Sequence, residues 1–160
     1  MKIVFATDHA GYSLKEALVP FVRDELGYEV EDMGAHALDP DDDYPLYVSR
    51  AADAVAANPG EVRAVILGGS GQGEAMVANR MRGVRAVVYY GPALQMQTDV
   101  EGEVLDMLAS TRAHNDANVL SLGARFISEE DAKEAVRTWL ATPFSGDERH
   151  RRRITAIDAM

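Results

Sequence analysis

A glycine-rich turn that ends in an acidic residue is the first feature of the sequence that could do chemistry. Residues 68–74 read Gly-Gly-Ser-Gly-Gln-Gly-Glu. Glycines let the backbone approach a ligand closely, and amide N–H groups at the start of a helix can bind an anion. The turn is not a P-loop, because the Lys-Ser/Thr pair is missing, and it lacks the spacing of a dinucleotide-binding motif. Taken alone, it is equally consistent with a tight strand-to-helix turn.

Asp8 and His9, which follow the first apolar run, are the second group of candidates. Glu74 closes the glycine turn, where an acid is also common because the helix dipole favours it. A carboxylate beside an anion-binding turn, facing Asp8 and His9, is suited to remove a proton next to a carbonyl group. The three residues together therefore predict a proton-transfer site.

The remaining histidines and a basic run supply further candidates. His114 comes just before the last apolar run, whereas His36 lies in a polar loop and is expected to be exposed. Residues 149–153 read Arg-His-Arg-Arg-Arg and form the only dense positive cluster of the sequence. Arg149 and Arg153 share a helix face, and guanidinium groups suit bidentate binding of phosphate. A solvated basic helix is the alternative.

The acidic stretch Asp-Pro-Asp-Asp-Asp at residues 39–43 is a weaker candidate. It lacks the spaced ligands and the final Glu of an EF-hand loop. We expect a solvated loop there, without a metal ion.

Alternation of strands and helices must position these residues. Strands are expected at Ile3–Ala6, Tyr28–Met33, Ala64–Leu67, Val84–Tyr90 and Asn118–Leu122. Helices are expected at roughly Tyr12–Leu26, Tyr47–Ala57, Glu74–Arg80, Pro92–Ser110, Glu129–Leu140 and from about Asp147 to the end. Pro20 should kink or break the first helix, and Ser128 should cap the fifth.

Continuous apolar runs are typical of parallel strands that are buried on both faces of a sheet. The pattern predicts a three-layer α/β/α, Rossmann-like (flavodoxin-like) fold with a five-stranded parallel sheet in the order 2-1-3-4-5. In that order the carboxyl ends of strands one and three meet at the switch point where ligands bind. Asp8 and the glycine turn follow those two strands.

Length and composition bound the class of protein. The chain has 160 residues, with 16 Lys plus Arg, 26 Asp plus Glu and no cysteine, and its formal net charge is -10. We expect one domain over residues 1–160, without disulfides or a cysteine nucleophile. The negative charge argues against nucleic acid and membrane surfaces as partners. The sequence starts directly with a strand pattern and no signal peptide, which favours a cytoplasmic protein.

Read in order, the motifs resemble those of the ribose-5-phosphate isomerase B family, which also includes the subunits of galactose-6-phosphate isomerase. The resemblance covers nearly the whole chain. It rests on Asp8-His9-Ala10-Gly11, Asp43-Tyr44-Pro45, Gly69-Ser70-Gly71-Gln72-Gly73-Glu74, Ala78-Asn79-Arg80, Gly83-Val84-Arg85-Ala86, His114-Asn115-Asp116, Asn118-Val119-Leu120, Gly123-Ala124-Arg125 and Arg149-His150-Arg151-Arg152-Arg153-Ile154.

The resemblance implies interconversion of an aldose phosphate and its ketose through a cis-enediolate, without a metal ion or an organic cofactor. Glu74 would be the base that moves the proton between C1 and C2. One branch of the family uses a cysteine at the position of Gly68, and this chain matches the branch that uses glutamate. Ser70 and the amides of Gly69–Gly73 would stabilise the enediolate oxygen.

The resemblance also implies how substrate is held. His114 would open the furanose ring, with Asp8 and Asn115 holding hydroxyl groups. The phosphate would be bound by His9, Arg125, Arg149 and Arg153. Substrate contacts are also expected from Tyr44, Gly69, Gly71, Gln72, Gly73, Asn79 and Asn115. The family builds its site at a dimer interface, so a homodimer or a tetramer is expected, with the C-terminal helix (about 147–160) on a neighbouring subunit.

Residues 89–112 are longer than is typical of the family. The addition could reshape the sugar pocket or be only a surface extension of a helix. Ribose 5-phosphate is the leading substrate, and a tetrose 4-phosphate or hexose 6-phosphate is the alternative. A non-catalytic sugar-phosphate-binding protein and, last, a nucleotide-binding protein are the readings outside this reaction class.

Overall fold

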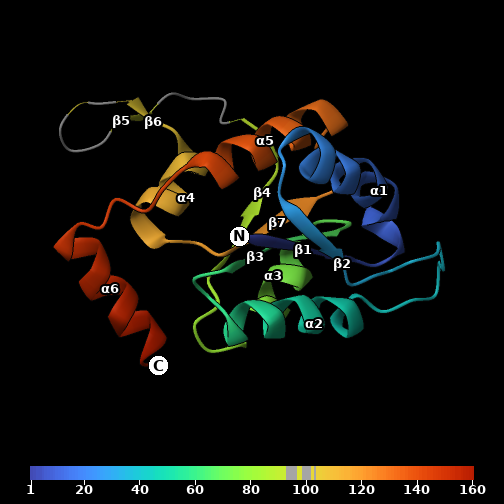
Figure 1. Ribbon diagram of the computed structural model, residues 1–160, viewed down its shortest axis with the longest axis horizontal. Coiled ribbons are helices and arrows are strands. Elements are labelled where there is room, and N and C mark those ends of the chain that lie inside the picture. The colour runs from blue at the N-terminus through green and yellow to red at the C-terminus, as the bar shows by residue number, and fades with distance from the viewer. Residues whose placement is uncertain (93–96, 99–101, 103) are drawn as a thin grey trace.

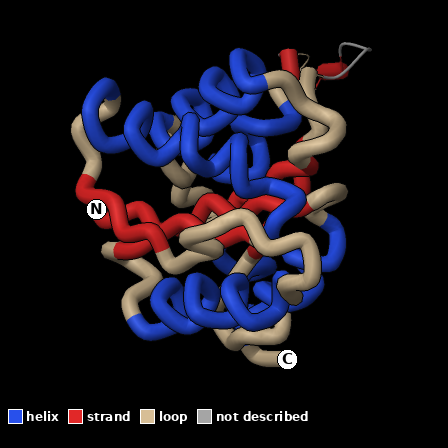
Figure 2. Tube along the Cα trace, turned by 90° about the vertical axis from the view of Figure 1, so that its right-hand side faces the viewer, coloured by secondary structure: helices blue, strands red, loops and turns tan. Residues whose placement is uncertain are grey.

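The fold is a parallel five-stranded sheet between two layers of helices (Figures 1 and 2). The computed structural model describes residues 1–92, 97–98, 102 and 104–160. The strands are β1 (Lys2–Thr7), β2 (Glu29–Asp32), β3 (Val62–Gly68), β4 (Ala86–Tyr89) and β7 (Val119–Gly123). These five strands and the three-layer architecture confirm the predicted fold class.

The order of the last two strands is not the predicted one. The sheet runs β2-β1-β3-β7-β4, so the last strand lies between the third and the fourth along the chain. All five residues of β7 are buried, whereas those of β4 are only half-buried, as suits an inner strand and an edge strand. The expected switch point between β1 and β3 is retained, because the interchange affects only the far side of the sheet.

The interchange brings the turn after β7 against the turn after β3. Gly68 pairs with Gly123 in the strand register. The backbone N–H of Ala124 donates to the carbonyl of Gly68 at 2.8 Å, and that of Arg125 donates to the carbonyl of Gly69 at 3.2 Å. Arg125 is thereby fixed beside the glycine turn.

Each face of the sheet carries its own helices and core (Figure 1). One face is covered by α1 (Tyr12–Pro20), η2 (Phe21–Glu25), α4 (Met107–Asn115) and α5 (Glu129–Ala141). The other face is covered by α2 (Tyr44–Ala57) and α3 (Gln72–Ala78). The short turn η1 (His9–Gly11) follows β1, and α6 (Glu148–Asp158) extends beyond the layers. None of the helices in the described part of the chain is long and apolar enough to cross a bilayer.

Pro20 and Ser128 act largely as predicted. The α-helix α1 ends at Pro20, and the chain continues as a single π-helical turn in which Leu26 N–H donates to the carbonyl of Phe21 at 3.1 Å. A proline has no N–H for the α-helical bond, so the wider turn starts there. Ser128 Oγ accepts from the backbone N–H of Asp131 at 3.1 Å, which confirms the cap.

The helix predicted for Pro92–Ser110 is wrong. The described part of this segment contains two short antiparallel strands, β5 (Gln97–Thr98) and β6 (Val104–Leu105), and α4 begins only at Met107. The positive φ angle at Gly102 is incompatible with a continuous helix, and Asp106 caps a new helix by accepting from Ala109 N–H. The remaining positions of the prediction lie outside the described residues.

We predict that alanine at Gly71 destabilises the protein more than alanine at Gly27. Both glycines have a left-handed φ, +73° and +75°. A Cβ at Gly71 would lie 2.9 Å from Ser121 Oγ, whereas Gly27 has nothing within 4 Å. Backbone strain alone should lower the free energy of unfolding by about 1–2 kcal/mol, and the added contact by at least about 1 kcal/mol more. Urea unfolding at one protein concentration measures both, and equal losses would contradict the role of the close contact.

Candidate active site

A cavity of about 460 Å³ lies at the carboxyl ends of β1 and β3. Ligand-binding clefts in proteins are of this size, and open parallel sheets place them at this edge. Its lining comprises Asp8, His9, Ala10, Tyr44, Gly69, Ser70, Gly73, Glu74, Arg125 and Phe126. The structure thus brings together eight of the predicted site residues: Asp8, His9, Tyr44, Gly69, Ser70, Gly73, Glu74 and Arg125.

Glu74 is the buried acid of this cavity. It lies in the first turn of α3 and is only 4% exposed. Burial raises the pKa of its carboxyl above the usual value, and the negative charge of Asp8 acts in the same direction. A carboxylate with a raised pKa is a stronger base, as proton abstraction beside a carbonyl requires.

The Glu74 carboxylate occupies the space that a side chain at Gly68 would need. A Cβ on Gly68 would lie 1.7 Å from Glu74 Oε1 and 2.1 Å from its carboxyl carbon. A cysteine at position 68 and this placement of Glu74 therefore exclude one another. The glycine at the end of β3 is what lets the acid reach over the strand end.

The glycine turn is held from below by β7. Ser121 Oγ donates to the carbonyl of Gly71 at 2.7 Å, and Ser70 Oγ accepts from the backbone N–H of Gln72 at 3.3 Å. Gly71 adopts its left-handed conformation there without a side chain to clash with β7. The exposed Ser70 and the amides that follow lie beside Glu74, where they could bind a developing oxyanion.

Arg125 and His9 border the same cavity. A Cβ on Gly69 would lie 3.4 Å from the guanidinium carbon of Arg125, so that group lies along the turn. His9 Nδ1 is 2.7 Å from Asp42 Oδ1, and this hydrogen bond raises the pKa of the imidazole. Together they make the cavity suited to bind an anion in a protein of net negative charge.

Asp42 is a residue that the sequence analysis missed. The solvated loop expected at residues 39–43 holds for Asp39, Asp41 and Asp43, which are exposed. The side chain of Asp42 is only 4% exposed and binds His9. Among the described residues, Asp8, His9 and Asp42 are the group whose ligand atoms, all within 4.8 Å, could hold a metal ion. The direct bond to Asp42 occupies Nδ1, so the geometry favours a hydrogen-bonded pair.

Tyr44 and Phe126 form the walls of the cavity. A Cβ on Gly73 would lie 2.5 Å from Tyr44 Oη, so the phenol covers the start of α3. Phe126 packs edge-on against Tyr90, with ring centroids 5.5 Å apart. Tyr90 Oη in turn accepts from Gln72 Nε2 at 2.6 Å.

Gln72 and Asn79, both expected to contact substrate, do not line this cavity. Gln72 is engaged by Tyr90, as above. Asn79 pairs with the backbone of Ala86, accepting at 2.7 Å and donating at 3.0 Å, and so anchors the start of β4. Gly71 shapes the turn without bordering the cavity.

His114 and Asn115 lie near the amino ends of the strands, whereas Glu74 lies at their carboxyl ends. They end α4, which leads into the first residue of β7, whereas the cavity lies at the strands' carboxyl ends. The His114 ring stacks on that of His150, with centroids 4.6 Å apart. Arg149 and Arg153 are exposed on α6. This helix lies beyond the amino ends of the strands (Figure 1). A single chain therefore carries two separate groups of the predicted site residues.

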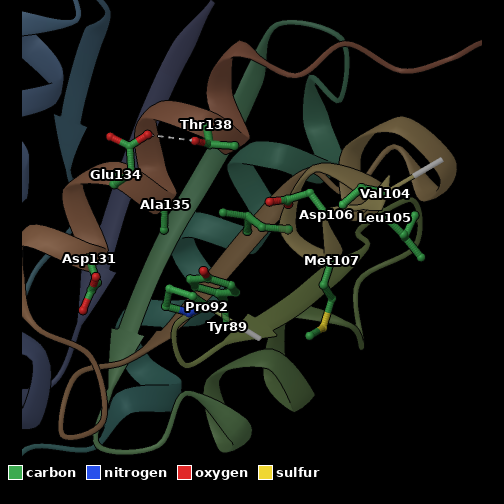
Figure 3. A pocket seen from close by; sticks show the side chains of 11 residues that line it. Tyr89, Pro92, Val104, Leu105, Asp106, Met107, Asp131, Glu134, Ala135 and Thr138 are labelled. Carbon is green, nitrogen blue, oxygen red and sulfur yellow. Dashed lines mark hydrogen bonds between the residues drawn. The ribbon is translucent and has the colours of Figure 1, made fainter. Parts of the chain in front are cut away.

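A second cavity, of about 370 Å³, lies between α5 and the long segment before α4 (Figure 3). Tyr89, Pro92, Leu105 and Met107 line one side of it, and Glu134 of α5 lines the other. It shares no lining residue with the first cavity. In its described part, the long segment borders α5, and it approaches the first cavity through Tyr90 and Phe126.

Known proteins resemble this chain over almost its full length. Residues 3–157 match the family described as Ribose/Galactose Isomerase. Ribose-5-phosphate isomerase B of Escherichia coli (strain K12) is 38% identical over 161 residues, covering 99% of this chain and 95% of the relative. The protein of the same name from Mycobacterium tuberculosis (strain CDC 1551 / Oshkosh) is 36% identical over 157 residues, covering 98% and 88%.

Solved structures agree with these relatives. Ribose-5-phosphate isomerase B from Mycoplasma genitalium with bound ribulose-5-phosphate superimposes with a TM-score of 0.86 at 31% identity, covering 99% of this chain and 94% of that one. The ribose 5-phosphate isomerase from Thermotoga maritima gives 0.84 at 37% identity, covering 99% and 98%. On sequence, fold and the residues gathered at the switch point, the chain belongs to the ribose/galactose isomerase family.

Proposed function

We propose that the protein interconverts D-ribose 5-phosphate and D-ribulose 5-phosphate. The names of its relatives support this substrate, as does the ribulose-5-phosphate bound to the Mycoplasma genitalium protein. The observation that carries the chemistry is the buried Glu74 carboxylate, of raised pKa, in a cavity bordered by Arg125 and His9.

Glu74 moves one proton between neighbouring carbons in this mechanism. It takes the proton from C2 of the open-chain aldose, and the electron pair shifts to the C1 carbonyl oxygen to give a cis-enediolate. Return of the proton to C1 and transfer of the O2 proton to O1 yield the ketose. Ser70 and the amides of the glycine turn stabilise the oxyanion, and Asp8 holds a sugar hydroxyl.

Binding of the phosphate is assigned to His9 and Arg125 from the same chain. Tyr44, Gly69 and Gly73 complete the substrate contacts on this side of the cavity. All of them border the cavity that contains Glu74, which supports a single binding mode for sugar and phosphate.

His114, Asn115, Arg149 and Arg153 are assigned to the site of a neighbouring copy. Their position toward the amino ends of the strands, away from Glu74, supports this, as does the exposure of most of α6. We therefore infer a homodimer of single-domain subunits, 1–160, in which the C-terminal helix packs on the partner; a tetramer would contain the same pair. Ring opening by His114 would then be done across the interface. A cytoplasmic location stays a prediction from the sequence.

Glu74→Gln should abolish proton transfer while preserving the shape of the site. We expect kcat for ribose 5-phosphate to fall by at least about a hundredfold, because the amide cannot act as a base. Binding of the substrate should change little. The assay is run with EDTA, and Glu130→Gln, an exposed acid of α5, is the matched control. Unchanged turnover by Glu74→Gln would reject the assignment.

The pH dependence of kcat/KM should report the carboxyl group of Glu74. Only the carboxylate form accepts a proton, and burial raises the pKa of this group. As the pH falls, activity should therefore decline at a higher pH than it would with an ordinary glutamate. The charge of Asp8 contributes to this increase. Asp8→Asn should therefore move the acidic limb to lower pH, whatever it does to the maximal rate. An acidic limb that stays in place or moves to higher pH in Asp8→Asn would contradict an effect of the Asp8 charge on the pKa of Glu74.

Mixing two inactive variants tests the shared site. Glu74→Gln and His114→Gln change opposite halves of the proposed site, so a mixed dimer holds one site with both changes and one intact site. Unfolding and refolding an equal mixture should restore roughly a quarter of wild-type activity, since half of the dimers are mixed and each has one intact site. Each variant refolded alone is the control. Recovery no greater than the sum of the controls would place both residues in one chain's site.

A further inference from the structure

One carboxylate oxygen of Asp42 holds both the backbone and the ring of His9. Asp42 Oδ1 accepts from the backbone N–H of His9 at 2.9 Å and lies 2.7 Å from Nδ1 of its imidazole. These two bonds fix the position of the residue and the rotation of its ring. The two residues are far apart in the sequence, one after β1 and the other just before α2.

The loop is folded so that Asp42 alone turns inward. Asp39 Oδ1 accepts from the backbone N–H of Asp41 at 3.1 Å, and the carbonyl oxygen of Asp39 accepts from the backbone N–H of Asp42 at 3.2 Å. This turn leaves Asp41 and Asp43 exposed, while the side chain of Asp42 is 4% exposed. Within the described ranges, Asp42 Oδ2 is buried without a hydrogen-bond partner. A buried carboxylate of this kind favours a positive charge on the group it does contact.

We propose that Asp42 is a positioning residue that keeps the His9 imidazole cationic and turned to present Nε2 to the substrate's phosphate. This role rests on the proposed function, which makes His9 a phosphate ligand. Nδ1 is engaged by Asp42, so Nε2 is the ring nitrogen that remains, and His9 borders the cavity together with Arg125.

Three charged groups act on His9, each from a different element. The hydrogen bond to Asp42 raises the pKa of the imidazole most, and the charge of Asp8, at the end of β1, raises it further. Burial and the positive charge of Arg125, after β7, lower it. Without the charge of Asp42, only Asp8 would counter the lowering of the His9 pKa by burial and by Arg125. The imidazole would then lose its proton at a lower pH.

Asp42→Asn is the sharpest test, because the amide oxygen can still accept from the His9 backbone while the negative charge is removed. The ring titrations of the four histidines are followed by NMR. His9→Asn assigns the signal of His9. We expect Asp42→Asn to move the His9 titration to lower pH and Asp41→Asn, an exposed neighbour, to leave it in place. An unchanged His9 titration in Asp42→Asn would overturn the proposal.

Kinetics test the consequence for phosphate binding. In Asp42→Asn, KM for ribose 5-phosphate should rise about tenfold at pH 8 and less than about threefold at pH 6, with kcat nearly unchanged. In a His9→Asn background, Asp42→Asn should add no further rise in KM. A full, additive effect there would show a merely structural role for the loop and overturn the proposal.

The inference and the proposed function can fail separately. The NMR titration needs no turnover, and it can be repeated with inorganic phosphate as the probe. Phosphate should bind the wild-type protein more tightly than Asp42→Asn at pH 8, and equal binding would overturn the inference. Absence of turnover by the wild-type protein with ribose 5-phosphate would instead overturn the proposed function.

Discussion

The contact between the Glu74 carboxylate and the bare backbone of Gly68 is the constraint on which the site depends. Any side chain at position 68 would collide with that carboxylate, so the acid can reach over the end of β3 only because the strand ends in glycine. The same placement buries the carboxylate and raises its pKa. Packing and chemistry are therefore set by one contact: the space that Gly68 leaves open is filled by the group proposed to move the proton.

The order of the strands distributes the rest of the site. With β7 beside β3, the turn that bears Arg125 lies against the glycine turn, and Ser121 supports that turn from below. With β1 on the other side of β3, Asp8 and His9 face the same cavity. The connection from α4 into β7 places His114 near the amino ends of the strands, away from the cavity. The sheet separates the two groups of residues within one chain, which is the basis for the proposed assignment of His114 to the site of a neighbouring copy.

The sequence predicted what depends on local pattern and on general rules for parallel sheets. The five strands, the cap at Ser128 and the cavity between the ends of β1 and β3 follow from apolar runs and from the switch point. The sequence did not predict what depends on contacts between distant residues. The exchange of β7 and β4 places the fully buried strand inside the sheet and the half-buried strand at its edge, a difference that their similar apolar runs do not reveal. Asp42 looked like its solvated neighbours, because only its contact with His9 distinguishes it.

The most direct test of the proposed chemistry is to follow isomerisation of ribose 5-phosphate in D₂O by NMR, with EDTA present. Proton transfer through Glu74 predicts that deuterium enters C1 of the ketose and, on return, C2 of the aldose, because the carboxyl proton exchanges with solvent during the lifetime of the enediolate. Turnover without deuterium in either product after many cycles would contradict an enediolate formed by this base.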